Sequence, residues 1–256
     1  MNRKKKNGVC VWKKILKKAG YLFAALLFLW GTGMLSGCGN SDMGKACDNF
    51  AGTDSLAKED EQALLNAISP AIVRIEAGKL FGSGIILDIG QHQILVITNR
   101  HLMEGDTPDV IFWDGMRAKA EALGYSEDCD LGFLQISLDD SQDMQVDRYR
   151  RARYDAAVFA DLKAGDELFI LGSADYPAGN LSYGTIGNCS IYMEDFEMDM
   201  LWAYCEVKPG MSGSGVFDRW GNLIGMVCGG NEEKEAAALP LDGILEEWQT
   251  IVEETF

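Results

Sequence analysis

Short apolar runs separated by glycine, aspartate and asparagine dominate the chain from residue 71 to residue 241. Runs of this length between turn-forming residues predict β-strands. A polar stretch at 138–155 divides them into two series. The first series is 71–76, 82–89, 93–99, 109–114, 118–126 and 130–137, and the second is 166–173, 182–193, 200–207, 213–218, 222–229 and 235–241. Two sets of six strands predict an all-β chain with two six-stranded antiparallel β-barrels.

Helical spacing of apolar residues appears on either side of these strands. Residues 57–68 predict a short helix that ends at Ser69-Pro70, and residues 242–256 predict a closing amphipathic helix. The dividing stretch 138–155 contains a cluster of arginines that alternates with two tyrosines: Arg148, Tyr149, Arg150, Arg151, Arg153 and Tyr154. We interpret this cluster as part of a solvated connector between the halves rather than as a phosphate site.

The N-terminus has the order of an export signal. Residues 1–37 carry eight Lys or Arg and no acid, and an uncharged apolar run occupies 21–35. The run ends in Leu35-Ser36-Gly37-Cys38, which resembles the bacterial lipobox and implies a lipid on Cys38 after removal of 1–37. The alternative is an uncleaved signal anchor over 19–37. Either way, we expect 38–56 to be a tether and 57–256 to be a domain held at the outer face of a cell membrane.

Charge and cysteine content exclude other classes of protein. Without residues 1–37, 15 basic residues face 39 acidic ones, a net charge of −24. Such a surface repels phosphate backbones, so we expect no nucleic-acid partner. The two histidines and seven cysteines show no zinc-ligand spacing, so we expect no metal or other cofactor.

Three residues in order along the chain carry the chemistry of nucleophilic catalysis. Ser212 lies among glycines in 210–215, where a sharp turn exposes a hydroxyl and aims N–H groups at one point. His101 follows an apolar strand, whereas His92 lies in a turn. Asp130 leads into another strand, where an acid can orient an imidazole. Taken singly, these three sites read as a hairpin turn, a structural histidine and a solvated cap.

Together they resemble the chymotrypsin-like serine proteases, and within them the HtrA/Deg-type branch. The resemblance runs from about Ser69 to Trp248 and rests on seven motifs in order: Ser69–Ile75, Gly82–Ile86, Thr98–Leu102, Asp130–Leu134, Leu171–Ser173, Pro209–Gly215 with Gly221–Gly225, and Ala238–Leu241. It implies a trypsin-like serine protease domain of two six-stranded antiparallel β-barrels with short N- and C-terminal helices. It also implies polypeptide substrates, and we expect no PDZ domain.

The resemblance assigns roles residue by residue. Ser212 is the nucleophile, His101 the general base and acid, and Asp130 the carboxylate that orients the imidazole. The N–H groups of Gly210 and Ser212 form the oxyanion hole. The substrate-binding residues are Cys228, Gly229 and Gly230, which pair with the substrate backbone, together with Glu206. Glycines at 229 and 230 predict a pocket open to a large side chain.

Some positions depart from the family pattern. Met211 replaces the usual Asn or Asp, which excludes activation by an ion pair with a newly cut N-terminus. Ser214-Gly215 replaces Gly-Pro. Arg100 beside His101 either lowers the pKa of the imidazole or points to solvent, and we favour solvent. Glu206 predicts cleavage after basic residues if it lies at the pocket base, and no such preference if it faces solvent, which we favour.

Cys189 and Cys205 fall on neighbouring predicted strands, so they either form a disulfide or remain free thiols. Three functions are considered: a membrane-anchored serine endopeptidase, a non-catalytic or trigger-dependent peptide-binding module on the same fold, and a structural lipoprotein. The first explains best why all three residue types fall in their motifs. A homo-oligomer, such as a trimer, is left undecided by the sequence.

Overall fold

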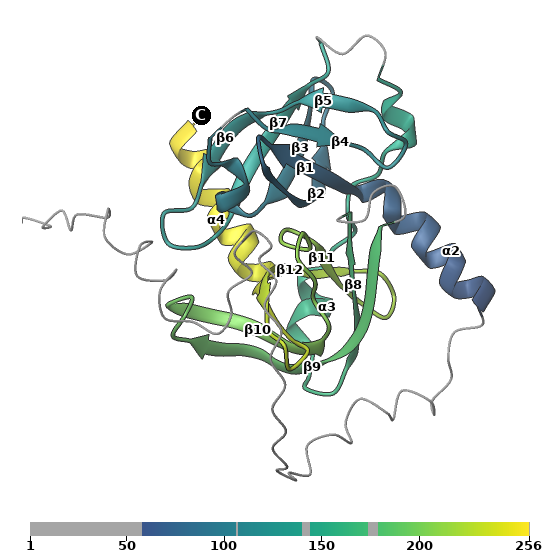
Figure 1. Cartoon of the computed structure of the whole chain (residues 1–256), viewed down its shortest axis with the longest axis vertical. Coiled ribbons are helices and arrows are strands. Elements are labelled where there is room, and N and C mark those ends of the chain that lie inside the picture. Colours follow the sequence, from purple (N-terminus) through teal and green to yellow (C-terminus); the bar gives the residue numbers. More distant parts are fainter. Residues whose placement is uncertain (1–57, 106, 140–143, 174–178, 256) are drawn as a thin grey trace, which may run out of the picture.

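A computed structural model describes residues 58–105, 107–139, 144–173 and 179–255 (Figure 1). Its N-terminal half is an antiparallel sheet, called here the first sheet, with strand order β5-β4-β1-β2-β3-β7-β6. The strands are β1 (Ile72–Ala77), β2 (Leu80–Ile89), β3 (Gln93–Thr98), β4 (Asp109–Ile111), β5 (Arg117–Lys119), β6 (Glu121–Tyr125) and β7 (Gly132–Ser137). They alternate buried aliphatic with polar residues or are buried on both faces, as their sequences predict.

The first sheet has seven strands instead of the predicted six because one predicted strand bends. The run at 118–126 divides at Ala120 into β5 and β6, which pair with β4 and β7 at opposite ends of the sheet. Ala120 is fully buried, and its N–H donates to the Pro108 carbonyl at 3.0 Å. The two ends of the sheet are therefore consecutive in the chain, which gives the sheet a barrel-like form.

The C-terminal half is a closed antiparallel barrel, called here the second barrel, with the order β10-β13-β12-β11-β8-β9. Its six strands match the predicted series: β8 (Glu167–Gly172), β9 (Asn180–Met193), β10 (Met198–Cys205), β11 (Gly215–Asp218), β12 (Leu223–Gly230) and β13 (Glu235–Pro240). The predicted all-β fold with two barrel-like halves and short terminal helices is thus confirmed.

Helices α2 (Lys58–Ile68) and α4 (Leu241–Thr255) both reach the boundary between the halves, and α2 projects outward from it (Figure 1). Helix α2 leads into η2 (Ser69–Ala71), and Ile68 packs against Gly221 of the second half. Helix α4 follows the last barrel strand yet packs on the first sheet, where the ring centroids of Trp248 and Phe133 are 5.1 Å apart. The closing helix therefore joins the two halves.

Three groups of buried apolar side chains form the core. One fills the first sheet around Ile75 and Val96, and one fills the second barrel around Ile170 and Val227. The third spans the boundary and includes Ile85 and Phe133 of the first sheet with Phe217 and Leu239 of the second barrel, next to Ile244 of α4. The boundary is thus a packed interface, and side chains near it are held from both halves.

The stretch 144–155 runs along both halves, as expected of a connector. It contains η4 (Val146–Arg148) and leads to α3 (Ala156–Ala160). Arg148 pairs with Asp114 at 2.8 Å and lies over the Trp113 ring. The Ala152 N–H donates to Ile86 of the first sheet, and the Arg153 carbonyl accepts from Leu223 of the second barrel. These contacts support the interpretation as a connector. The prediction that it is solvated holds for the arginines but is wrong for Tyr149, which is 2% exposed and stacks on Phe112.

A disulfide between Cys189 and Cys205 is absent, and both are free thiols. The β9–β10 turn is at 194–197, and shifts in register at Trp202 place Gly184 opposite Cys205. Cys189 is five residues further along β9, or about 16 Å at roughly 3.3 Å per residue, which is beyond disulfide reach. The interpretation as free thiols is the correct one.

The predicted signal segment 1–37, the lipid site Cys38 and the tether 38–56 lie outside the described residues. Within the described part of the chain, no helix has the length and apolar character to cross a bilayer.

Candidate active site

Strand register brings His101 and Asp130 together. β3 ends at Thr98, which pairs with Gly132 of β7, and η3 (Arg100–Met103) carries His101 just beyond the strand end. Asp130 lies just before β7. Its Oδ2 is 2.8 Å from His101 Nδ1, and its Oδ1 accepts a hydrogen bond from the His101 backbone N–H at 3.1 Å. Two contacts to one carboxylate fix the imidazole and leave Nε2 as the nitrogen available to a proton donor.

The environment of His101 raises the pKa of its imidazole above the ordinary value. Burial lowers this pKa, but the hydrogen bond and charge of Asp130 and the charge of Glu104 outweigh burial. The side chain of His101 is 34% exposed and that of Asp130 is 13% exposed. The imidazole is therefore reachable from solvent while its carboxylate partner is shielded. His92, in contrast, is exposed and pairs with exposed Asp139, as expected for a loop histidine.

Asn99, which the sequence analysis did not select, holds the backbone of Asp130. It is fully buried, and its Nδ2 donates to the Asp130 carbonyl at 3.0 Å and contacts Cys228 Sγ at 3.5 Å. Among the described residues its Oδ1 finds no hydrogen-bond partner. The sequence feature that could have indicated this contact is a polar residue at the end of an apolar strand, two positions before His101.

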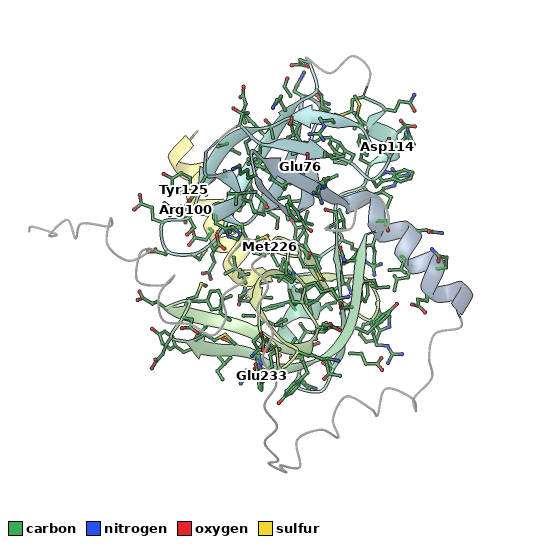
Figure 2. The ribbon with its side chains drawn as sticks, in the orientation of Figure 1. Glu76, Arg100, Asp114, Tyr125, Met226 and Glu233 are labelled. Atoms are coloured by element: carbon green, nitrogen blue, oxygen red, sulfur yellow. The ribbon has the colours of Figure 1, made fainter. Side chains whose placement is uncertain are left out.

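Arg100 points away from the imidazole. Its guanidinium lies 4.2 Å from the ring centroid of Tyr125, and its Nη1 donates to the Ser126 carbonyl at 2.9 Å (Figure 2). It is not among the causes of the raised pKa of His101. Arg100 therefore neither lowers the pKa of the imidazole nor simply points to solvent. Its side chain instead stabilises the segment that leads to Asp130.

A tight turn shapes the Ser212 loop. The Met211 N–H donates to the Lys208 carbonyl at 3.0 Å, and Gly210 has φ 86°. A proline followed by a glycine with positive φ defines a type II turn. Met211 is fully buried in the second barrel. The methionine thus anchors the loop by apolar packing, at the position where the resembled family carries Asn or Asp.

The N–H groups of Gly210 and Ser212 differ from those of their neighbours in this loop. The Gly213 N–H donates to the Val227 carbonyl, and the Ser214 N–H donates to the Met211 carbonyl. Among the described residues, no acceptor is within hydrogen-bond geometry of the Gly210 or Ser212 N–H. Backbone N–H groups rarely go unpaired, so this pair offers two donors to an incoming oxygen.

The Ser212 loop meets the His101 segment at Gly82 of β2. A Cβ at Gly82 would lie 2.4 Å from Leu102 Cδ1 and 2.9 Å from the Ser212 carbonyl oxygen, so only glycine fits between them. The Ser83 N–H donates to the Ser212 carbonyl at 2.8 Å. Within the described chain, no hydrogen bond joins the Ser212 hydroxyl to His101. Such contacts are often long without substrate.

The two glycines of the predicted pocket have different surroundings. A Cβ at Gly230 would lie 2.8 Å from Val207 Cβ, so Val207 occupies the space beside Gly230. A Cβ at Gly229 would lie 3.5 Å from Phe196 of the β9–β10 turn, which is an ordinary contact, so a pocket open to a large side chain stays a prediction. Glu206 is exposed whereas Val207 is buried, so the solvent-facing alternative for Glu206 holds.

Cys228 of β12 is half-buried, and its thiol lies beside Asn99. Burial raises the pKa of its thiol well above the ordinary value, and the charge of Asp130 adds to this. The thiol of Cys228 therefore stays protonated and contacts Asn99. Within the described ranges, no group of three or more His, Cys, Asp or Glu side chains is placed to hold a metal.

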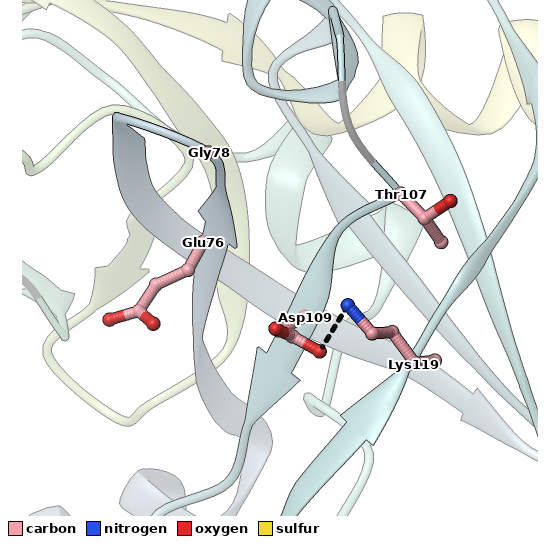
Figure 3. A pocket seen from close by; sticks show the side chains of 5 residues that line it. All are labelled: Glu76, Gly78, Thr107, Asp109 and Lys119. Atoms are coloured by element: carbon pink, nitrogen blue, oxygen red, sulfur yellow. Dashed lines mark ion pairs between the residues drawn. The ribbon is translucent and has the colours of Figure 1, made fainter.

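A separate surface pocket of about 700 Å³ lies at the far edge of the first sheet (Figure 3). Its lining residues are Glu76, Gly78, Thr107, Asp109 and Lys119. Lys119 pairs with Asp109 at 3.0 Å, while Glu76 pairs with Arg74 and Arg117. Each charged residue of this pocket thus has an ion-pair partner, and none of His101, Asp130 and Ser212 lines it.

The two strand-built halves, with a carboxylate–imidazole pair beside a glycine-rich serine loop, have the architecture of a known family of peptidases. The family model of the trypsin-like peptidase domain matches residues 82–226, more than half of the chain. The chain belongs to this family.

Curated relatives narrow the likeness to the HtrA branch. The chain is 26% identical over 176 residues to the serine protease Do-like HtrA of Lactococcus lactis subsp. cremoris, and 24% identical over 176 residues to that of Lactococcus lactis subsp. lactis. The match covers 64% of this chain and 40% of each relative. The chain thus spans about two fifths of the length of these relatives.

Solved structures share the fold. The HtrA-type protease AlgW with a tripeptide has a TM-score of 0.63 at 22% identity, over 75% of this chain and 64% of that one. An inactive form of Rv3671c from M. tuberculosis H37Rv, a serine-to-alanine mutant, has a TM-score of 0.60 at 18% identity, over 74% of this chain and 90% of that one. At these identities the likeness supports the fold alone.

Proposed function

We propose that this chain is a serine endopeptidase that uses Ser212, His101 and Asp130 as its catalytic triad. The observation that carries the proposal is the pairing of His101 with Asp130 next to a loop in which the N–H groups of Gly210 and Ser212 have no acceptor among the described residues. Neither the His101–Asp130 pair alone nor the Ser212 loop alone would support nucleophilic catalysis, because the reaction needs both a base and a nucleophile. The family membership and the HtrA relatives agree with it.

The mechanism follows from these groups. Ser212 Oγ attacks the peptide carbonyl while His101 Nε2 accepts the hydroxyl proton. Asp130 holds Nδ1–H and stabilises the imidazolium that forms. The Gly210 and Ser212 N–H groups receive the negative oxygen of the tetrahedral intermediate, and a donor of this kind is worth roughly 10²–10³ in rate. His101 returns the proton to the leaving amine, and water then hydrolyses the acyl-enzyme by the same groups.

The substrate is an extended polypeptide that pairs with the end of β12, at Cys228, Gly229 and Gly230. Main-chain pairing gives affinity with little dependence on sequence. Because Val207 fills the space beside Gly230 and Glu206 is exposed, the side chain before the cleaved bond is small and apolar. This replaces the hypothesis of cleavage after basic residues.

The protease domain is held outside the cell membrane by the N-terminal segment. Support comes from the sequence: a basic start, an apolar run and the lipobox-like Leu35–Cys38. Lipid on Cys38 or an uncleaved anchor over 19–37 gives the same orientation, since the positive charges stay in the cytoplasm.

The test is cleavage of an unfolded protein and a peptide library by the full chain, with Ser212→Ala as control and fragments identified by mass spectrometry. The proposal predicts wild-type cleavage after small apolar residues and none by the variant. Cleavage after Arg or Lys would contradict the proposed pocket. Peptide binding by the wild type without cleavage would contradict the enzyme and favour the binding module.

A further inference from the structure

A cluster of buried serines lies directly behind the Ser212 loop. Ser83 of β2 and Ser214, which precedes β11, are fully buried, and Ser173, which follows β8, is 8% exposed. Ser83 Oγ is 3.2 Å from Ser214 Oγ and accepts a hydrogen bond from the Ser173 N–H at 2.9 Å. Ser173 Oγ donates to the Val73 carbonyl at 2.8 Å. Each buried hydroxyl therefore has a partner, as buried polar groups require.

Every one of these bonds crosses the boundary between the halves. Val73 and Ser83 belong to the first sheet, whereas Ser173 and Ser214 belong to the second half. The Ser83 N–H adds another crossing bond, to the Ser212 carbonyl at 2.8 Å. His101 is carried by the first sheet and Ser212 by the second barrel. The position of the nucleophile relative to its base therefore depends on the bonds that join the halves here.

Ser214 and Gly172 fit each other. A Cβ at Gly172 would lie 2.0 Å from Ser214 Oγ and 2.9 Å from Ser83 Oγ. The Ser214 hydroxyl thus fills the space that glycine leaves beside β8. Ser214 is also one of the positions at which this chain departs from the Gly-Pro pattern of the family it resembles. The hydroxyl group is therefore a specific addition with a matched space and a matched partner.

We propose that Ser214 is a positioning residue for Ser212, an inference that rests on the proposed role of Ser212 as nucleophile. Its hydroxyl holds the Ser83 side chain, and the backbone of Ser83 holds the Ser212 carbonyl. Without the hydroxyl, the loop is freer to shift relative to His101, and attack geometry is sensitive to shifts of about 1 Å. The effect falls on kcat, because β12, where substrate pairs, keeps its own side chains.

The experiment compares kcat, KM and thermal unfolding of the full chain and three variants on one peptide substrate. Ser214→Ala is expected to lower kcat roughly five- to tenfold, the loss of about one hydrogen bond, with KM unchanged. Gly172→Ala places a methyl group against the hydroxyl and lowers the unfolding temperature. The double variant Gly172→Ala with Ser214→Gly fills the space without a hydroxyl, so it regains part of the stability but keeps the low kcat.

The control is Ser190→Ala, which removes an exposed hydroxyl on β9 and leaves kcat unchanged. A wild-type kcat in Ser214→Ala, or a kcat restored in the double variant, would overturn the positioning role while the enzyme itself stands. An inactive but folded wild-type chain would overturn the proposed function and this inference together. The two failures are thus distinguishable.

Discussion

The two sides of the candidate site are built differently. On the first sheet, His101 and Asp130 satisfy each other through two contacts, and Asn99 holds the carbonyl of Asp130. On the second barrel, the Ser212 loop is fixed through its carbonyl and its buried Met211, while the N–H groups of Gly210 and Ser212 find no acceptor among the described residues. The imidazole and its carboxylate are thus already paired, whereas the Ser212 loop keeps two donors for an acceptor from outside the described chain.

This contrast agrees with the chemistry that we propose for each side. A general base must hold one tautomer before the reaction starts, so its hydrogen bonds are formed in advance. An oxyanion hole must reserve its donors for charge that develops later, so its N–H groups cannot be used up by the protein. Each prediction below changes one side and measures whether the other side is affected.

The largest effect is expected from removal of the nucleophile. Ser212→Ala should lower peptide hydrolysis by about 10⁴- to 10⁶-fold, since the rate that remains comes from binding and the oxyanion hole. The measurement is kcat/KM on a peptide substrate, with circular dichroism as the control for folding. A variant that keeps a tenth of the wild-type rate would remove Ser212 from the mechanism.

A smaller but still large effect is expected on the acid–base side. Asp130→Asn should lower kcat by about 10⁴-fold because the imidazole loses its preferred tautomer. The base acts when neutral, and Asp130 raises the pKa of His101, so the variant should lose its residual activity at a lower pH than the wild type. The measurement is the pH profile of kcat/KM.

The matched control is Asp139→Asn, which breaks the exposed pair with His92 at 3.0 Å and should change neither rate nor pH profile. An acid limb that stayed in place in Asp130→Asn would mean that another group titrates.

Enlarging the pocket should change specificity and not chemistry. Val207→Ala frees space beside Gly230, so the preference for a peptide with leucine over one with alanine before the cleaved bond should rise about tenfold. The measurement is the ratio of kcat/KM values for the two peptides. Val110→Ala removes the same atoms from the core of the first sheet and serves as control. An equal shift in both variants would argue for general loosening of the fold.

The smallest effect is expected from Glu104, which is exposed and acts on His101 by charge alone. Glu104→Gln should move the acid limb of the pH profile to lower pH, by less than Asp130→Asn does. Because exposed charges are screened, the difference from wild type should shrink as salt is added. A shift that is independent of salt would contradict a purely electrostatic role.

Much of this molecule follows from local sequence pattern. Apolar runs of strand length predict the strands except for the division of 118–126 into β5 and β6, and the spacing of Ile244, Trp248 and Ile251 predicts α4. The strands and α4 depend on a few consecutive residues, which is why sequence alone identifies them. His101, Asp130 and Ser212 are selected only together, by the order of the motifs that resemble the protease family, since each alone reads as an ordinary structural residue.

The missed features depend on segments that are distant in the chain. The bend at Ala120 follows from pairing with two different edges, and the register of β9 against β10 separates Cys189 from Cys205. The space beside Gly230 is filled by Val207, and the Ser214 hydroxyl fits against Gly172. Which side chain occupies the space beside a glycine is set by tertiary packing, so no local pattern carries it.

The central claim is that Ser212 is an activated nucleophile. The most direct measurement is labelling of the folded full chain with a fluorophosphonate probe, followed by peptide mapping of the adduct. We expect one adduct on Ser212, none in Ser212→Ala, and slow labelling in Asp130→Asn. Labelling that persists in Ser212→Ala, or no labelling of a folded wild-type chain, would contradict the claim.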